Sequence, residues 1–385
     1  MGQRSPYGHG VAAAFLLGTL ALAGTAHADV EPAKPVTFGA VLTAEALDNL
    51  QGGVNRGTWG EANLDLTAAW KGSAHWEAYG YILVDQHGGF SGRYSGDTQT
   101  VSNIDAPAGV RLFEAWARHT STDQHFITTL GVINLNGIFD TQPIGGVFLN
   151  ASNGIGPDYS QSGPSIFPFS GLGAVEEWHL GDHLRWRAGV FDGVPADPEH
   201  RTAFVSLMLR HAEGLHLVTE VEADFDRGFV KAGAWRDTAP AARLDGTGNG
   251  HKSGAYAQLG WTFTHEHDDA AQGLSGWLRA GAASQAVLNL SGYAGGGLVY
   301  TGLLPHRDHD QVGLSLAHAT YGADFRLLNP GWRQAETTLE ATYQYEVKPG
   351  TTLQPDLQWI HHPAGNPDLK DDLVVGFRFR RDLLS

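Results

Sequence analysis

The stretch ETTLEATYQYEVKPGTTLQPDLQWIHHP, residues 336–363, predicts two antiparallel β-strands joined by a tight turn. Apolar and polar side chains alternate along both halves, so each strand presents one set to each face of a sheet. The loop Lys348–Gly350 supplies the reversal, because Pro349 fixes φ and Gly350 accepts a positive φ. One face of this hairpin is therefore apolar and the other is polar.

The register of the hairpin follows from the same alternation. Opposing Tyr345 with Leu353 and Leu339 with Trp359 keeps the apolar side chains on one face, and a slip of one residue destroys that match. Pro355 breaks the pattern because it lacks a ladder donor, so we expect a bulge or an unpaired position there. The hairpin alone leaves two options: the apolar face packs inward in a soluble sandwich, or faces lipid in a membrane barrel.

The N-terminal segment indicates export. An apolar run extends from Val11 to about Ala23, and the small residues Ala26 and Ala28 fit the rule for signal-peptide cleavage. The run is short for a transmembrane helix, which needs about 20 residues. We predict a signal peptide over residues 1–28, a mature domain over residues 29–385, and localisation in the outer membrane.

The composition favours a membrane barrel. The chain has 51 Gly, 11 Trp, no Cys and a formal net charge of −16. Gly, Trp and Tyr in alternating segments of modest hydropathy are typical of outer-membrane barrels. The lipid-facing side chains of such a barrel alternate with polar ones, so the mean hydropathy of a sequence window stays low. The acidic balance argues against nucleic acid as a partner, since its binders concentrate Lys and Arg.

Alternating segments recur along the whole mature chain and predict an all-β fold. Examples are residues 36–47, 63–70, 76–84, 217–225, 255–263, 311–319, 321–328 and 373–379. Short connections alternate with long ones, such as the polar loop 85–109, as in barrels with short periplasmic turns and longer outer loops. We predict a single closed, antiparallel transmembrane β-barrel of about 16 strands.

Residues 134–173 lack clear alternation but carry many aromatic and apolar side chains. Loops this long are usually functional or disordered, and this composition does not suit disorder. We therefore expect this segment to fold into the lumen as a constriction loop.

Five stretches occur in the order found in a known family. They are residues 102–116 (SNI…RLFEAW), 146–157 (GVFLNASNGIGP), 254–258 (GAYAQ), 310–314 (DQVGL) and 336–367. Together they resemble the carbohydrate-selective porins of the OprB type. The resemblance implies a sixteen-stranded outer-membrane barrel that passes sugars, without identifying the sugar. Many such barrels end on an aromatic residue, whereas here Arg380–Ser385 follow Phe379. Either the final strand stops at Phe379 and leaves a tail, or assembly relies on an internal Phe.

Candidate pathway residues combine aromatic rings with fixed donors and acceptors, which is what a sugar needs. In the long central segment they are Asn134, Asn136, Asp140, Phe148, Asn150, Asn153, Asp158 and Tyr159. Among the polar side chains that alternate with apolar ones along the strands, they are Arg185, Arg187, Arg279, Glu340 and Arg378. Two purely structural interpretations stay open. The loop residues stabilise turns, and the arginines form a wall of ion pairs that shapes the lumen.

Other chemistry has weaker support in the sequence. The clusters at residues 265–269 and 306–310 contain metal-ligand types but suit solvated acidic loops, so we predict neither a metal nor a cofactor. No G-x-S-x-G, P-loop or H-E-x-x-H motif occurs. We predict a porin, not an enzyme, for passive diffusion of small neutral carbohydrates. Its other partners are outer-membrane lipids, and it is a monomer or a homotrimer. A general diffusion porin, a barrel hydrolase and an adhesin remain alternatives.

Overall fold

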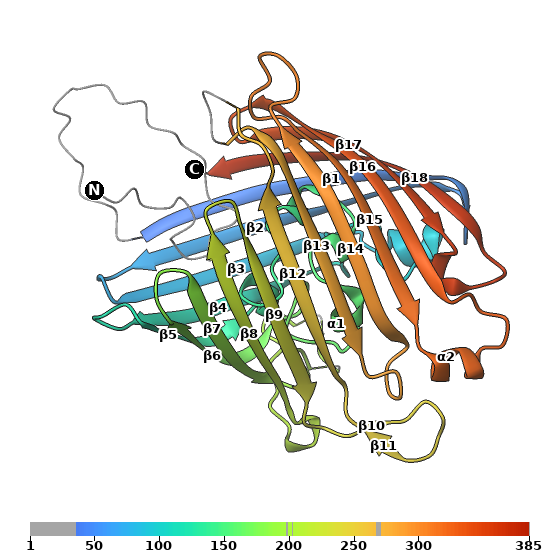
Figure 1. The fold of residues 1–385 in the computed structure, drawn as a ribbon, viewed down its shortest axis with the longest axis horizontal. Coiled ribbons are helices and arrows are strands. Elements are labelled where there is room, and N and C mark those ends of the chain that lie inside the picture. Colours follow the sequence, from blue (N-terminus) through green and yellow to red (C-terminus); the bar gives the residue numbers. More distant parts are fainter. Residues whose placement is uncertain (1–35, 198, 202, 267–270, 385) are drawn as a thin grey trace.

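A closed barrel accounts for most of the structure. The computed structural model describes residues 36–384 except 198, 202 and 267–270, and within them sixteen strands form one antiparallel barrel (Figure 1). The first strand, β1 (Val36–Gly53), pairs with the last, β18 (Lys370–Leu384), so the sheet closes without a free edge. The predicted barrel is confirmed, while the predicted signal peptide lies outside the described residues.

The remaining elements have the following bounds. The other strands of the barrel are β2 (Gly57–Lys71), β3 (Trp76–Gln86), β4 (Gly109–Thr120), β5 (Phe126–Ile133), β6 (Gly171–His179), β7 (Leu184–Asp192), β8 (Leu215–Phe225), β9 (Gly228–Asp237), β12 (Ser253–Thr262), β13 (Gly273–Ala283), β14 (Leu290–Thr301), β15 (Gln311–Tyr321), β16 (Ala335–Lys348) and β17 (Thr351–His361). Outside the barrel, β10 (Ala241–Ala242) and β11 (Asn249–Gly250) form a small hairpin. The helical turns are η1 (Ser91–Ser95), η2 (Leu135–Gly137), η3 (Gly145–Val147), η4 (Ala151–Asn153), α1 (Pro157–Ser160), η5 (His211–Glu213), α2 (Ala323–Leu328) and η6 (Pro363–Gly365).

The two ends of the barrel differ. One end carries the start of β1, the end of β18 and short turns such as 226–227 and 349–350. The opposite end carries the long connections 87–108, 134–170 and 193–214. The start of β1 and the end of β18 share this end because the number of strands in the barrel is even. This asymmetry matches the predicted alternation of short periplasmic turns and longer outer loops. No helix within the described residues is long and apolar enough to cross a membrane.

The hairpin of β16 and β17 shows which face meets lipid. Leu339 pairs with Trp359 and Tyr345 with Leu353, as predicted. Leu339 is 42% exposed, whereas its neighbour Glu340 is 2% exposed. The apolar side chains of the hairpin therefore face outward and the polar ones face the lumen, which is the arrangement of a membrane barrel.

Two details of this hairpin depart from a regular ladder. The turn is one residue tighter than predicted, since Lys348 rather than Val347 pairs with Thr351 and the register shifts at this point. Pairing between β16 and β17 is also interrupted at Pro355, which still pairs with Phe377 of β18. The expected unpaired position at Pro355 is confirmed, because proline offers no N–H to β16.

The ends of two strands differ from the sequence pattern. Of the two alternatives for the last strand, the stop at Phe379 is excluded, because β18 continues to Leu384, whose partner is Ala40. The strand predicted at 321–328 is wrong, because β15 ends at Tyr321 and the short helix α2 follows it. Gly322 caps this helix in an extended conformation, and Asp324 lies in its first turn, where an acidic side chain suits the helix dipole.

The outward parity leads to a prediction about membrane insertion. Leu357 lies in the middle of β17 and is 45% exposed on the lipid side. We expect Leu357→Arg to destabilise the inserted barrel by about 2–4 kcal/mol, because a cation near the bilayer midplane loses its hydration. The measurement is reversible unfolding in urea from liposomes.

Val347→Arg is the matched control. Val347 is also exposed, but it lies at the end of β16 beside the turn, where the same substitution costs roughly 0–1 kcal/mol. Equal destabilisation by the two variants would contradict the assignment of the lipid face.

Candidate functional site: the partly filled lumen

Residues 134–170, the constriction loop, leave the wall after β5 and fold into the barrel. Their side chains and backbone bond to inward-facing residues of strands on several sides of the lumen. Asp140 meets Arg279 of β13, Asn153 meets Glu340 of β16, and Asn150 meets Gln358 of β17. The predicted inward loop is therefore confirmed.

Apolar contacts hold one half of this loop against the wall. Phe139 and Tyr159 are fully buried in a cluster with Val218 of β8, Trp235 of β9 and Tyr256 of β12. The rings of Tyr159 and Trp235 stack with centroids 4.8 Å apart and planes 4° from parallel. The inward parity of these strands is thus apolar where the loop docks, and burial of this surface favours the folded-in position.

Arg279 makes the central ionic contact of the constriction loop. Its guanidinium lies 2.7 Å from a carboxylate oxygen of Asp140 and 2.7 Å from one of Asp158. The side chains of all three residues are almost completely buried. Gly156 permits this approach, since a Cβ there would lie 2.0 Å from the Arg279 Nη1 atom. One planar fork therefore joins two parts of the loop to the wall.

Glu340 receives the other half of the loop. Its carboxylate accepts the backbone N–H of Leu149 and the side-chain amide of Asn153, the latter at 2.8 Å. Asn150 adds a bond of 3.1 Å from its amide to Gln358. These polar residues of β16 and β17 face the lumen, but their side chains form hydrogen bonds with the loop.

A buried chain of polar groups continues this docking. The Tyr159 hydroxyl and Nε2 of His216 are 2.8 Å apart, and Nδ1 of His216 lies 2.6 Å from Asp237. Burial raises the pKa of Tyr159 well above its ordinary value. The tyrosine therefore stays neutral, and its hydroxyl donates a hydrogen bond to Nε2 of His216 when that nitrogen is unprotonated.

A second inward segment, residues 87–108, was not anticipated as part of the lumen. The backbone N–H groups of Thr98 and Gln99 donate to Glu336 of β16 at 2.8 and 2.9 Å. The segment also bonds to the constriction loop, with Asn103 N donating to the Leu149 carbonyl at 2.7 Å. Burial raises the pKa of Asp97 in this segment.

Its sequence conceals this inward position. The segment is rich in Gly, Ser and Asp, which are also the residues of solvated loops. Phe90 and Val101, which pack with Leu47 and Ile360 of the inner wall, give a weak apolar signal together with Tyr94 and Ile104. The two inward segments together fill part of the barrel.

The structure places the predicted loop residues mainly in packing and turns. Asn134 and Asn136 bond within their own turn, since Asn136 N donates to the Asn134 side chain at 3.2 Å. Phe148 is 1% exposed and packs with Val147 and Val299. Asp140, Asn150, Asn153, Asp158 and Tyr159 are equally buried in the contacts described above.

The predicted arginines form ion pairs. Arg187 bonds to Glu220 and Glu222 at 2.8 and 2.6 Å, and Arg185 bonds to Glu222 at 3.0 Å. Arg378 pairs with Glu45 and donates to Asn103 of the second inward segment. Glu340, by contrast, binds the constriction loop. The interpretation as a wall of ion pairs describes this geometry well.

A cavity remains beside the constriction loop. Its lining combines charged, small polar and aliphatic side chains from β4 to β8 with two loop residues. They are Arg118, Ile127, Thr129, Ile138, Thr141, Val175, Glu177, Arg185, Arg187 and Glu222. Of the predicted residues, Arg185 and Arg187 therefore border open space.

Sequence reasoning missed an aromatic patch next to this cavity. Tyr79 of β3 and Trp116 of β4 pair directly and stack at 5.2 Å, and Arg118 lies 4.7 Å from the Trp116 ring. All three are half-buried rather than sealed. The signal was available, because Tyr79 shares the inward parity of Glu77 and Asp85.

Comparison with known proteins agrees with this architecture. The family model of the carbohydrate-selective porins, the OprB family, matches residues 55–382. The chain belongs to this family. The assignment favours a porin over the barrel hydrolase and the adhesin that the sequence left open, and it places the protein in the outer membrane.

Individual relatives of this OprB-family porin are distant. Porin B of Pseudomonas aeruginosa is 27% identical over 156 residues, which cover 35% of this chain and 34% of Porin B. The high-pH structure of Pseudomonas putida OprB matches with a TM-score of 0.81 and 18% identity, covering 91% of this chain and 94% of that one. The channel DcaP of Acinetobacter baumannii matches with a TM-score of 0.57, 10% identity, and coverage of 90% and 97%. These structural likenesses show the fold.

The Arg279 contact predicts a change in conductance. Arg279→Ala leaves Asp140 and Asp158 buried without their cation, which we expect to destabilise the docked loop by about 3–5 kcal/mol. The loop should leave its position and single-channel conductance in planar bilayers should rise.

Arg243→Ala is the control, because Arg243 is an outer-loop residue that pairs with Asp245 away from the lumen. Faster hydrogen exchange across residues 134–170 in the Arg279 variant alone should accompany the change. Unchanged conductance and exchange would show that apolar packing suffices to hold the loop.

Proposed function

We propose that this OprB-family porin carries small neutral sugars, of the size of mono- and disaccharides, by passive diffusion. The observation that supports it is the half-buried patch of Tyr79, Trp116 and Arg118 beside the open cavity. Aromatic rings receive the apolar C–H faces of a sugar, while fixed charged groups meet its hydroxyls. The buried loop residues position this path and do not line it.

The charges around the cavity favour a neutral solute. Arg118, Arg185 and Arg187 stand with Glu177 and Glu222, and Arg187 is already paired with both carboxylates. Opposed charges of both signs offer donors and acceptors to hydroxyl groups without a strong preference for one ion. The formal net charge of −16 further disfavours acidic metabolites and phosphorylated sugars.

Transport requires that the sugar binds weakly. A solute must leave a channel as readily as it enters. A micromolar site holds its ligand with about −8 kcal/mol, whereas a millimolar site holds it with about −4 kcal/mol. We therefore propose weak contacts spread over the aromatic patch and the ion pairs of the wall.

The aromatic patch predicts how a variant responds to sugar. We expect glucose and a disaccharide to reduce ion current through the wild-type channel in planar bilayers, in a concentration-dependent way, and an organic acid to do so less. Trp116→Ala should weaken this block about five- to thirtyfold, since loss of the apolar contact with one ring face removes about 1–2 kcal/mol.

Trp70→Ala provides a matched control, because Trp70 is 43% exposed on the lipid side of β2. It should leave the sugar block unchanged. A current that no sugar reduces would support a general diffusion porin, and equal effects of the two tryptophan variants would remove the aromatic patch from the pathway.

A further inference from the structure

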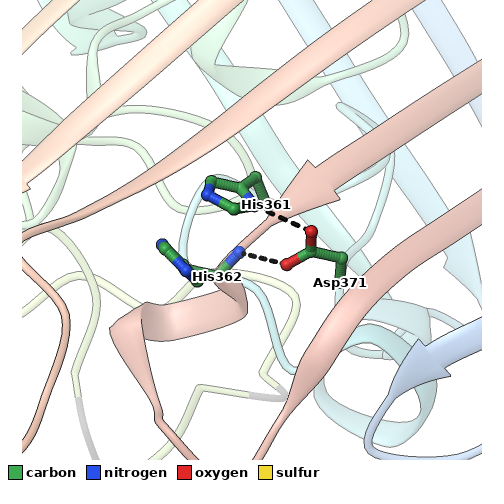
Figure 2. Close-up of side chains that lie close together, drawn as sticks. All are labelled: His361, His362 and Asp371. Atoms are coloured by element: carbon green, nitrogen blue, oxygen red, sulfur yellow. Dashed lines mark hydrogen bonds and ion pairs between the residues drawn. The ribbon is translucent and has the colours of Figure 1, made fainter.

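Two histidines and an aspartate converge where β17 ends and β18 begins, at the end of the barrel with the long connections (Figure 2). Nδ1 of His361 lies 2.7 Å from Oδ2 of Asp371, and the backbone N–H of His362 donates to Oδ1 at 3.1 Å. The centroids of the two imidazole rings are 3.7 Å apart. None of these residues belongs to the His/Asp clusters that the sequence singled out.

The backbone explains why two successive side chains share one side. Neighbouring residues of a strand normally point to opposite faces. His362 instead adopts a left-handed conformation, with φ 57° and ψ 63°, directly after the last residue of β17. This turn brings its ring beside that of His361, which also stacks on Trp359 at 5.2 Å.

We propose that His361, His362 and Asp371 bind a divalent transition-metal ion of the Zn²⁺ type. One ligand atom from each residue lies within 4.8 Å of the others, a spacing that a metal ion can bridge. Two imidazole nitrogens and one carboxylate oxygen are the donors that Zn²⁺ accepts. When Nδ1 of His361 binds the ion, the imidazole carries its proton on Nε2, because a ligating nitrogen must be unprotonated.

Access and coordination number fit an ion that enters from water. His361 is the last residue of β17, at the rim, and the side chains of His361 and Asp371 are 40% and 34% exposed there, so water can complete the coordination. Arg333 acts electrostatically on His362 and opposes an added positive charge, whereas the carboxylate of Asp371 favours it. Three protein ligands with an open position are therefore the arrangement that we assign.

Other His/Asp groups among the described residues are weaker candidates. Asp197, Glu199 and His200 meet the same spacing, but Arg210 lies 3.4 Å from Asp197 and 3.7 Å from Glu199. The guanidinium of Arg210 already pairs with both carboxylates and opposes a second cation there.

The site is connected to the lumen by one short turn. η6 follows His362, and the backbone N–H of its Ala364 donates to Glu336. Glu336 also accepts the N–H groups of Thr98 and Gln99 in the second inward segment. A metal ion at the rim would fix the turn that shares this carboxylate.

The test uses Zn²⁺ alone with the purified full-length barrel. We expect one Zn²⁺ per chain in competition with a chromophoric chelator, and an anomalous difference peak between His361, His362 and Asp371 in Zn²⁺-soaked crystals. His362→Asn should weaken this binding at least tenfold, because asparagine tolerates the left-handed backbone but removes the imidazole.

His306→Asn is the matched control, since His306 is also left-handed and exposed. It should leave the affinity unchanged. Equal affinity in wild type and His362→Asn, loss of binding in His200→Asn instead, or an anomalous peak only at other histidines would each overturn the proposal.

Discussion

The constraint on which this structure depends is that lipid offers no hydrogen bonds to a polypeptide backbone. Pairing of β1 with β18 meets it, because the first and last strands complete each other's ladders around the barrel. Closure fixes which side of each strand is inside, and the period of two then divides the side chains between lipid and lumen. Leu357 and Gln358, adjacent in β17, show the result: the first is exposed to lipid and the second is fully buried inside.

Once closed, the wall uses its inner face for two purposes. Where Val218, Trp235 and Tyr256 point inward, the wall is apolar and receives the constriction loop. Where Tyr79, Trp116 and Arg118 point inward, the loop covers the surface only in part: Trp116 packs against the edge of the loop cluster, and all three side chains remain half-buried. The path for solute therefore follows the part of the inner wall that the two inward segments leave uncovered.

Buried charge gives the inward segments their register. The contact of Arg279 with Asp140 and Asp158 buries three charges away from water. Such ion pairs add little to the free energy of unfolding, because the cost of desolvation offsets their attraction. The same contacts are demanding in geometry, since any shift of the loop leaves a buried charge unpaired. Apolar burial thus drives docking, while Arg279 and Glu340 select one docked position.

The sequence determined the barrel because its signal is local. Alternation, turn residues and connection lengths are properties of neighbouring residues, and they predicted the pairing of Leu339 with Trp359 and the outward apolar face. Local patterns also showed that residues 134–173 could not be an ordinary loop. They failed at residues 87–108, where a composition typical of solvated turns hides an inward segment, and at the end of β18, where polar Arg380 and Arg381 continue a paired strand.

Only the tertiary structure decided the role of each lumen residue. Asp140 and Tyr159 look like pathway residues in the sequence, but residues more than fifty positions away bury them. Tyr79 and Trp116 look like ordinary strand residues, yet pairing of β3 with β4 stacks them beside open space. His361, His362 and Asp371 meet only because a left-handed residue turns one ring back and β18 returns beside β17. Exposure depends on contacts between distant segments, and the spacing of residues along one chain does not carry that information.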